Sequence, residues 1–284
     1  MKQKLEQERT KQANQTMLRK SMKVFFIILA ALLLVFFSIF AYDRLTIGKT
    51  YFKQEKNLKI PIFVYHNIVK TQQEIEHDYM QTTAKTFEKQ LNGLQKAGYH
   101  FISYDDLIAY QKGEKKLYKK SAIITFDDGW EGVYQNAYPI LQNYNIPATC
   151  FLIDENMGKE TVLKWEQVRQ MKQSGLISFY SHGKQHLYYD KVSPNQLVED
   201  TLQAHQKIEK ELGEKQTRIF TYPYGVYTEE TVKTLEQQGF VQNLTDNKIN
   251  TSKKLNLSKL HRCYPLSDPV WKILLKIEYR NIRY

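Results

Sequence analysis

Two adjacent carboxylates, Asp127 and Asp128, follow an apolar run and precede a glycine in the stretch AIITFDDGW (122–130). Neighbouring like charges repel, and an ordinary turn before a glycine needs only one Asp or Asn. Adjacent side chains at the end of an extended strand point in opposite directions. One carboxylate can therefore bind a cation, which offsets the repulsion, while the other acts as a base. A plain Asp-Asp-Gly turn is the alternative for this motif taken alone.

Two histidines four residues apart, His182 and His186, follow another apolar run in the stretch FYSHGKQHLYYD (179–190). If the chain turns helically there, both imidazoles reach one metal ion, although two exposed loop histidines would show the same spacing. With one Asp of the pair they would make three protein ligands and leave positions open for water and substrate, as a catalytic site requires. A structural zinc site would be closed and richer in cysteine.

A third motif, TYPYG (221–225), follows an apolar run and precedes a predicted helix. Pro223 fixes φ and Gly225 permits a tight bend, so the backbone N–H of Tyr224 can be held towards a site. A preorganised N–H of this kind stabilises an oxyanion. By itself the motif also fits a proline-glycine turn with packed tyrosines.

A repeating pattern of strands and helices must position these residues. Apolar runs predict strands at 60–66, 99–103, 121–126, 148–153, 176–181 and 218–223, with weaker ones at 240–245 and 257–264. Helical periodicity alternates with them at 87–98, 131–145, 165–175, 194–213 and 229–239, and an amphipathic stretch follows at 268–280. Such alternation predicts parallel strands joined by crossover helices.

Seven or so strand–helix units favour a barrel or incomplete barrel over an open sheet. Chemistry in such folds gathers at the carboxyl ends of the strands. Unusual polar residues occur at these places: His66, Asp127 with Asp128, His182 and the turn at Tyr224 each directly follow an apolar run. The sequence therefore predicts that they meet at one end of the barrel.

The motifs TFDDG, HGKQH and YPYG, in this order and separated by helical units, resemble those of the polysaccharide deacetylase family, the NodB-homology carbohydrate esterases. The resemblance spans roughly residues 60–265. It implies a distorted (β/α)7-type barrel that binds a divalent metal through an Asp-His-His set. Zinc is the first choice for that metal, with cobalt, nickel or manganese as alternatives.

Carried over residue by residue, the resemblance implies distinct roles for the matched positions. Asp127 would be the general base, and the amide N–H of Tyr224 would stabilise the oxyanion. The metal ligands would be Asp128, His182 and His186.

The chain departs from the family pattern at three places. Gly183 stands where many members have Ser or Thr, and Thr221 stands where many have an arginine that positions the base. A downstream leucine-x-histidine strand that would supply the general acid is also weak. In a branch that includes poly-β-1,6-N-acetylglucosamine deacetylases, the strand order looks circularly permuted and the acid histidine comes from an N-terminal strand. His66, in FVYHNI, fits that position and is the predicted general acid, with His261 as second choice.

An uncharged run of nineteen residues, 24–42, precedes all of these motifs. At 1.5 Å per residue it would extend about 28 Å, close to the hydrocarbon core of a bilayer. It is longer than the apolar core of about 7–15 residues in a signal peptide and lacks a clean A-x-A cleavage site. An uncleaved transmembrane helix is therefore predicted, and the basic residues before it keep the N-terminus in the cytoplasm.

The resulting organisation is a cytoplasmic basic segment (1–23), an anchor (24–42), a tether (43–59) and a catalytic domain (60–284) outside the cell. The net charge is +11, of which the first 23 residues supply +5 from seven basic and two acidic side chains. The exported part is only mildly basic and shows no compact basic–aromatic patch, so no nucleic-acid partner is expected. Cys150 reads as a core thiol, and a disulfide with Cys263 is left open.

The resemblance and the anchor together predict a membrane-anchored extracellular enzyme. Its reaction would be the metal-dependent removal of acetyl groups from N-acetylglucosamine residues in a cell-wall or surface polysaccharide. Two alternatives stay open. One is a polysaccharide O-acetyl esterase that uses the same site, and the other is a degenerate glycan-binding module without activity.

Overall fold

The computed structural model describes residues 22, 23, 29, 31, 33, 34, 58–76 and 80–279. The chain divides into two compact units, residues 1–53 and 54–284, and the elements below belong to the second. Within the described part of the chain, no helix is both long and apolar enough to cross a bilayer. Most of the predicted cytoplasmic segment, anchor and tether (1–59) lies outside the described residues.

A sheet of parallel strands forms the centre of the second unit, with the order β12-β10-β9-β8-β7-β6-β2. Its strands are β2 (Ile62–Tyr65), β6 (Ser121–Phe126), β7 (Ala148–Leu152), β8 (Ile177–Ser181), β9 (Ile219–Thr221), β10 (Val241–Thr245) and β12 (Leu260–Arg262). β5 (His100–Phe101) pairs with β6 beside this path. All of these pairings are parallel, as the strand–helix alternation predicted.

The two ends of this sheet meet. Phe63 on β2 forms a parallel bridge with Cys263, directly after β12. The N–H of Val64 donates to the carbonyl of Cys263 at 3.0 Å, and the N–H of Cys263 donates to the carbonyl of Ile62 at 2.9 Å. The sheet is therefore a near-closed barrel of parallel strands, in agreement with the predicted (β/α)7 type.

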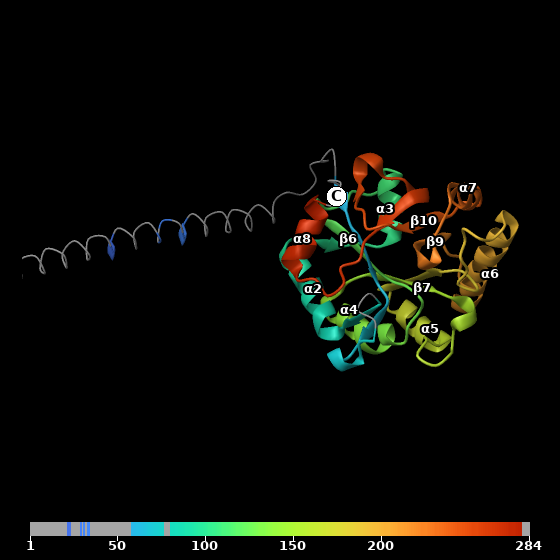
Figure 1. Cartoon of the computed structure of the whole chain (residues 1–284), viewed down its shortest axis with the longest axis horizontal. Helices are drawn as coiled ribbons and strands as arrows, with labels where there is room; N and C mark the ends of the chain where they lie inside the picture. The colour runs from blue at the N-terminus through green and yellow to red at the C-terminus, as the bar shows by residue number, and fades with distance from the viewer. Residues whose placement is uncertain are drawn as a thin grey trace, which may run out of the picture. The chain divides into compact units, whose positions relative to one another are not determined.

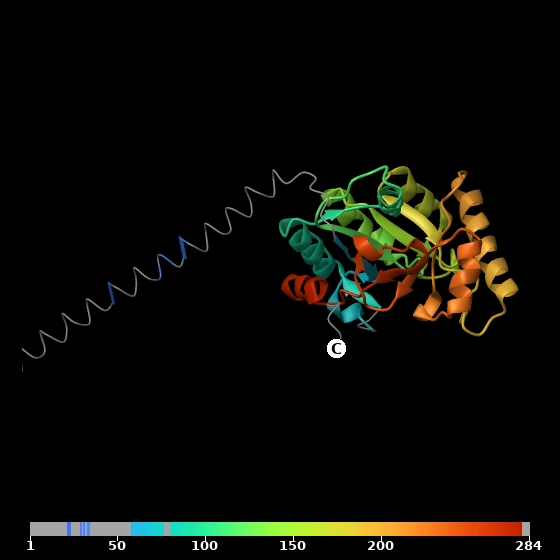
Figure 2. The same ribbon diagram turned by 90° about the horizontal axis from the view of Figure 1, so that it is seen from above.

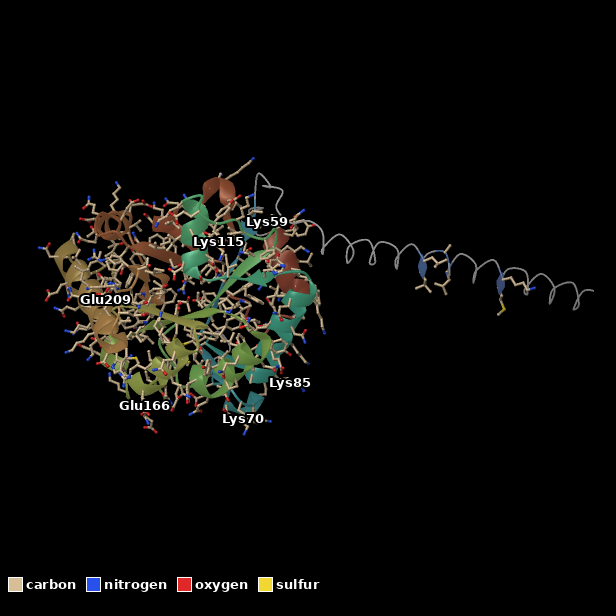
Figure 3. The ribbon with its side chains drawn as sticks, turned by 180° about the vertical axis from the view of Figure 1, so that it is seen from behind. Lys59, Lys70, Lys85, Lys115, Glu166 and Glu209 are labelled. Carbon is tan, nitrogen blue, oxygen red and sulfur yellow. The ribbon has the colours of Figure 1, made fainter. Side chains whose placement is uncertain are left out.

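Helices surround the barrel, as Figures 1 and 2 show from two directions. They are α2 (Ala84–Lys96), α3 (Tyr104–Gln111), α4 (Tyr138–Tyr144), α5 (Trp165–Gln173), α6 (Pro194–Leu212), α7 (Glu229–Gln237) and α8 (Val270–Tyr279). Their outer faces carry charged side chains, among them Lys85 on α2 and Glu166 on α5 (Figure 3). Their inner faces pack on the sheet.

Two helical segments differ from the prediction. The sequence did not predict α3, whose eight residues begin at a capping box: the Ser103 hydroxyl accepts from the N–H of Asp106, and the Asp106 carboxylate accepts from the N–H of Ser103. The predicted helix 131–145 divides into a π-helical turn, η2 (Val133–Ala137), and α4. Pro139 lies in the first turn of α4, directly after this π-helical turn.

Short elements complete the unit. β1 (Lys59–Ile60) pairs with β11 (Asn250–Thr251), and β3 (Asn67–Val69) pairs with β4 (Gln81–Thr83). The 3₁₀ turns are η1 (Gln72–Glu74), η3 (Asp154–Asn156), η4 (Pro223–Gly225), η5 (Ser252–Lys254) and η6 (Leu257–Lys259).

The core has two main layers because both faces of the barrel strands are covered. On β2, Ile62 points to a cluster that also contains Phe151 and Leu260, whereas Phe63 points to a second cluster between the sheet and the helices. This explains why the strands read as continuous apolar runs. Cys150 and Cys263 are both buried in the second cluster as free thiols.

Candidate active site

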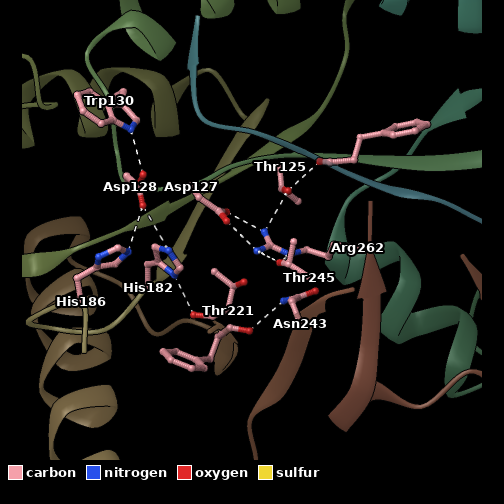
Figure 4. A network of polar contacts seen from close by, with 12 residues as sticks. Thr125, Asp127, Asp128, Trp130, His182, His186, Thr221, Asn243, Thr245 and Arg262 are labelled. Atoms are coloured by element: carbon pink, nitrogen blue, oxygen red, sulfur yellow. Dashed lines mark hydrogen bonds and ion pairs between the residues drawn. The ribbon is translucent and has the colours of Figure 1, made fainter. Parts of the chain in front are cut away.

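Four predicted site residues come together at the carboxyl ends of β6 and β8, which lie on either side of β7 in the sheet. Asp127 and Asp128 directly follow β6, and His182 directly follows β8. His186 lies at the other end of a short loop, and its ring faces Asp128 (Figure 4). The predicted meeting of these residues at the strand ends is what the structure shows.

The carboxylates of Asp127 and Asp128 point to different partners, as their alternation on the strand predicted. Asp128 faces the two histidines, whereas Asp127 faces Arg262 (Figure 4). Asp128 adopts φ 71°, in the left-handed region, and Gly129 follows with φ 74°. A non-glycine residue in this conformation stores about 1–3 kcal/mol of strain, which the surrounding structure must hold in place. This backbone conformation directs the carboxylates of Asp127 and Asp128 to different sides.

Three ligand atoms converge around Asp128. Its Oδ1 lies 3.4 Å from Nε2 of His182 and 3.5 Å from Nε2 of His186. The three atoms lie within 4.8 Å of one another. Nδ1 of His182 lies 2.9 Å from the carbonyl oxygen of Thr221, which can only accept, so Nδ1 carries the hydrogen and neutral His182 presents a lone pair on Nε2. Electron-rich atoms that face one another in this way fit a divalent cation between them.

The donor set is of the kind that binds zinc in catalytic sites: two imidazole nitrogens and one carboxylate. The hydrogen bond from His182 to Thr221 is the outer contact that orients such a ligand. On the far side, the indole N–H of Trp130 donates to Oδ2 of Asp128 at 3.1 Å and fixes that carboxylate. The residues present therefore fit a metal ion.

Electrostatics within the cluster follow the same geometry. Burial by itself would raise the pKa of Asp128, but hydrogen bonds from His182 and His186, together with the charges of His182 and His66, hold this pKa well below its usual value. Burial would likewise lower the pKa of His182, but the carboxylates of Asp128 and Asp127 raise it above its usual value. Asp128 is therefore negatively charged and favours a positive partner, and a bound cation can be that partner.

Asp127 is held by Arg262 on the last strand. The guanidinium donates hydrogen bonds of 2.7 Å to each carboxylate oxygen, and the exposed fractions of the two side chains are 4% and 1%. Burial by itself would raise the pKa of Asp127, but the charge and hydrogen bonds of Arg262 lower it. Asp127 is therefore ionised at neutral pH and can accept a proton. Arg262 also donates to the hydroxyls of Thr125 and Thr245 (Figure 4).

Arg262 is the arginine that pairs with the proposed base, and the sequence analysis did not identify it. The family pattern put this residue at position 221, where the chain has Thr221. A signal was present in β12: side chains alternate along a strand, so Leu260, which is apolar, shares a face with Arg262 and not with His261. The buried face of β12 therefore carries the arginine.

The two candidate acids lie in different surroundings. His66 follows β2, stacks on Tyr264 at 6.0 Å between ring centroids, and has a buried Nδ1 without a hydrogen-bond partner among the described residues. Burial lowers the pKa of His66 and outweighs the opposite effect of Asp127 and Asp128, which are close enough to act on it. His261 instead places Nδ1 at 2.9 Å from the carboxylate of Asp246.

The predicted oxyanion donor lies in η4, beside the ligand cluster. Tyr224 adopts φ 58°, a second strained conformation in the site, and its ring centroid is 4.4 Å from that of His186. The turn is closed by the N–H of Gly225, which donates to Tyr222, and by the N–H of Val226, which donates to Pro223. The N–H of Tyr224 is not one of these two donors.

Known proteins are similar to this chain in sequence and in fold. The polysaccharide deacetylase family model matches residues 114–242. The Bacillus subtilis protein YxkH, whose name places it among the polysaccharide deacetylases, is 33% identical over 210 residues, which are 74% of this chain and 72% of YxkH. A poly-beta-1,6-N-acetyl-D-glucosamine N-deacetylase of Staphylococcus epidermidis is 27% identical over 201 residues, which are 66% of this chain and 68% of that protein.

Among solved structures, the Streptococcus pyogenes deacetylase PplD in complex with acetate superposes with a TM-score of 0.71 and 26% sequence identity. The match covers 78% of this chain and 99% of PplD. The similarity to YxkH extends over more than two thirds of both chains. The chain therefore belongs to the polysaccharide deacetylase family.

Proposed function

We propose that this protein is a metal-dependent de-N-acetylase that acts on N-acetylglucosamine residues of a cell-wall or surface polysaccharide. One observation carries the proposal: an ionised carboxylate, Asp127, is held by Arg262 next to the convergent donors of Asp128, His182 and His186. A base beside a cation site is the arrangement that hydrolysis of an acetamide requires.

The proposed reaction begins with water positioned near Asp127. Asp127 removes a proton from the water, whose oxygen attacks the carbonyl carbon of the acetamide. A divalent ion bound by Asp128, His182 and His186 would polarise that carbonyl and make water a stronger nucleophile. The N–H of Tyr224 donates to the oxyanion. His66, in its protonated imidazolium form, delivers a proton to the amine as the carbon–nitrogen bond breaks, which releases acetate and a glucosamine unit.

The choice of substrate rests on the relatives. The Staphylococcus epidermidis relative is named for poly-beta-1,6-N-acetyl-D-glucosamine, and His66 and YPYG match the branch of the family that includes such enzymes. The uncharged run at 24–42 and the basic residues before it support a single-pass anchor with a cytoplasmic N-terminus and an extracellular catalytic domain. Zinc is the proposed metal, since two imidazoles and one carboxylate suit it.

The ion pair between Asp127 and Arg262 argues against a degenerate glycan-binding module. That alternative was motivated by a missing arginine, and Arg262 supplies a guanidinium to Asp127 from another strand. A retained base with a buried counter-ion favours activity over binding alone. The O-acetyl esterase alternative uses the same site and is separated from the amidase only by substrate.

The test is acetate release by the full-length protein in detergent from N-acetylglucosamine oligomers and from O-acetylated polysaccharide. Activity is measured as isolated, after chelation, and after zinc or cobalt is restored. The proposal expects activity on the N-acetylated oligomers that disappears with chelator, returns with metal and is absent in Asp127→Asn. Release from O-acetylated polymer alone would support the esterase. A folded, metal-loaded protein that is silent on both substrates would support the binding module.

A further inference from the structure

A short loop, residues 183–185, separates the two histidines of the candidate metal site, and each of its amides has a partner. The N–H of Gly183 donates to the hydroxyl of Ser181 at 3.0 Å. The N–H groups of Lys184 and Gln185 donate to the two oxygens of one carboxylate, that of Asp200, at 2.7 Å and 3.2 Å. One side chain on α6 thus binds most of the loop.

Asp200 is itself buried, with an exposed fraction of 5%. Its third donor is the hydroxyl of Tyr189, at 2.5 Å from Oδ2. Lys184 and Gln185 precede His186 in the chain, and Tyr189 follows it, so the carboxylate links both sides of this histidine. A buried carboxylate needs several donors, and all three of these come from the segment that carries His186.

The opposite side of the loop is held by η3. The N–H of Asp154 donates to the carbonyl of Gly183 at 3.2 Å, and the N–H of Glu155 donates to the carbonyl of Lys184 at 3.1 Å. His186 has φ 56°. A non-glycine residue keeps such a conformation, at about 1–3 kcal/mol, only where its surroundings determine it from several directions. Asp200 and η3 constrain the loop from two different sides.

The carboxylate of Asp200 leaves no room for a side chain at Gly183. A Cβ atom on Gly183 would lie 2.5 Å from the Tyr189 hydroxyl and 3.0 Å from Oδ2 of Asp200. A Ser or Thr, which many family members have at this position, would displace both groups. The contact between Asp200 and Tyr189 that holds the loop therefore requires a glycine at position 183.

We infer that Asp200 is a positioning residue for the metal site, since its carboxylate holds the loop that places His186 opposite His182 and Asp128. The inference rests on the metal site proposed above. If the loop were loose, ion binding would have to order His186, and the affinity would fall by that cost. Outer contacts of metal ligands typically change affinity by about 10–100-fold.

The test measures zinc and cobalt affinity of the full-length protein by competition with a chelator, together with the visible spectrum of the cobalt form. Asp200→Asn keeps the shape but replaces one acceptor oxygen by a donor. It is expected to weaken affinity by about 10–100-fold and to change the cobalt spectrum. Asp190→Asn, an exposed residue of the same segment, is the matched control and leaves both unchanged. The melting temperature of each metal-free variant reports whether it is folded.

Tyr189→Phe provides a second, milder variant, since it removes one donor and leaves both amide bonds to Asp200. It is expected to weaken affinity less than Asp200→Asn, and it decides the question if Asp200→Asn does not fold. A folded Asp200→Asn, or failing that Tyr189→Phe, with the affinity and spectrum of the wild type overturns the positioning role. A wild-type protein that binds neither ion overturns the metal site itself, and the positioning role with it.

Discussion

Arg262 and Asp127 lie 135 residues apart in the sequence, yet the guanidinium donates two hydrogen bonds of 2.7 Å to the carboxylate. The pair connects β12 and the end of β6, which lie near opposite ends of the sheet order and come to either side of β2 where the sheet closes. Both side chains are buried, so each depends on the other for compensation of its charge. The pair therefore contributes to the position of the proposed base and to the stability of the barrel.

Replacement of Arg262 by methionine is expected to change the pH dependence of activity. Burial favours protonated Asp127 and the arginine opposes it, so removal of the guanidinium raises the pKa of Asp127. Because the base must be ionised, the acidic limb of the kcat/KM profile moves to higher pH. Loss of one partner from a buried pair also lowers the free energy of unfolding, by about 3–5 kcal/mol. Acetate release across a pH series and chemical denaturation measure the two effects.

Arg169→Met is the control for this change. Arg169 pairs with Glu211 at 3.0 Å on the outside of the barrel, where an ion pair contributes about 0–1 kcal/mol. Its pH profile should match the wild type. An Arg262→Met enzyme that remains folded and keeps the acidic limb of the wild type would contradict the role assigned to the pair.

His66→Gln is expected to lower kcat by about 10²–10⁴-fold, the usual contribution of a general acid. The metal affinity should remain unchanged, because His66 is not one of the three convergent donors. His261→Gln is the comparison: His261 pairs with Asp246, and its loss should leave kcat close to that of the wild type. Steady-state acetate release at saturating substrate provides kcat, and chelator competition provides the affinity. The reverse pattern would make His261 the acid.

Metal binding should stabilise the fold. An ion that binds only the folded protein adds about 2.7 kcal/mol to the free energy of unfolding at a concentration of 100 Kd. The melting temperature should therefore rise with added zinc, fall after chelation, and no longer respond in Asp128→Asn. Asp190→Asn, with its exposed side chain, should respond like the wild type. A rise of equal size in Asp128→Asn would show that the ion binds elsewhere.

Gly93 on α2 allows α8 to approach closely. A Cβ at Gly93 would lie 2.3 Å from Cγ2 of Val270, so Gly93→Ala should destabilise the fold by about 1–3 kcal/mol despite the better helix propensity of alanine. Val270→Ala removes the obstructing methyl groups. The double variant should therefore be more stable than the sum of the single changes predicts, with a coupling of at least about 0.5 kcal/mol. Strictly additive free energies of unfolding would show that α8 simply shifts away.

The sequence was sufficient for the features that depend on local pattern. Apolar runs that end in polar residues predicted the strands and the convergence of Asp128, His182 and His186, because parallel strands end on the same side. Arg262 was missed because its partner comes from another strand and the expected position was occupied by Thr221. Asp200 was missed because an aspartate inside an amphipathic helix reads as a solvent-facing residue, and only tertiary packing buries it.

The closure of the barrel gives the site an order of assembly in time. During synthesis Asp127 emerges 135 residues before Arg262, and Cys263, which joins the last strand to β2, comes directly after Arg262. Until that point the growing chain has two open sheet edges and a carboxylate without its counter-ion. Closure of the barrel and pairing of the base therefore occur in the same step, and a chain cut short before Arg262 would have neither the closing strand nor the counter-ion of Asp127.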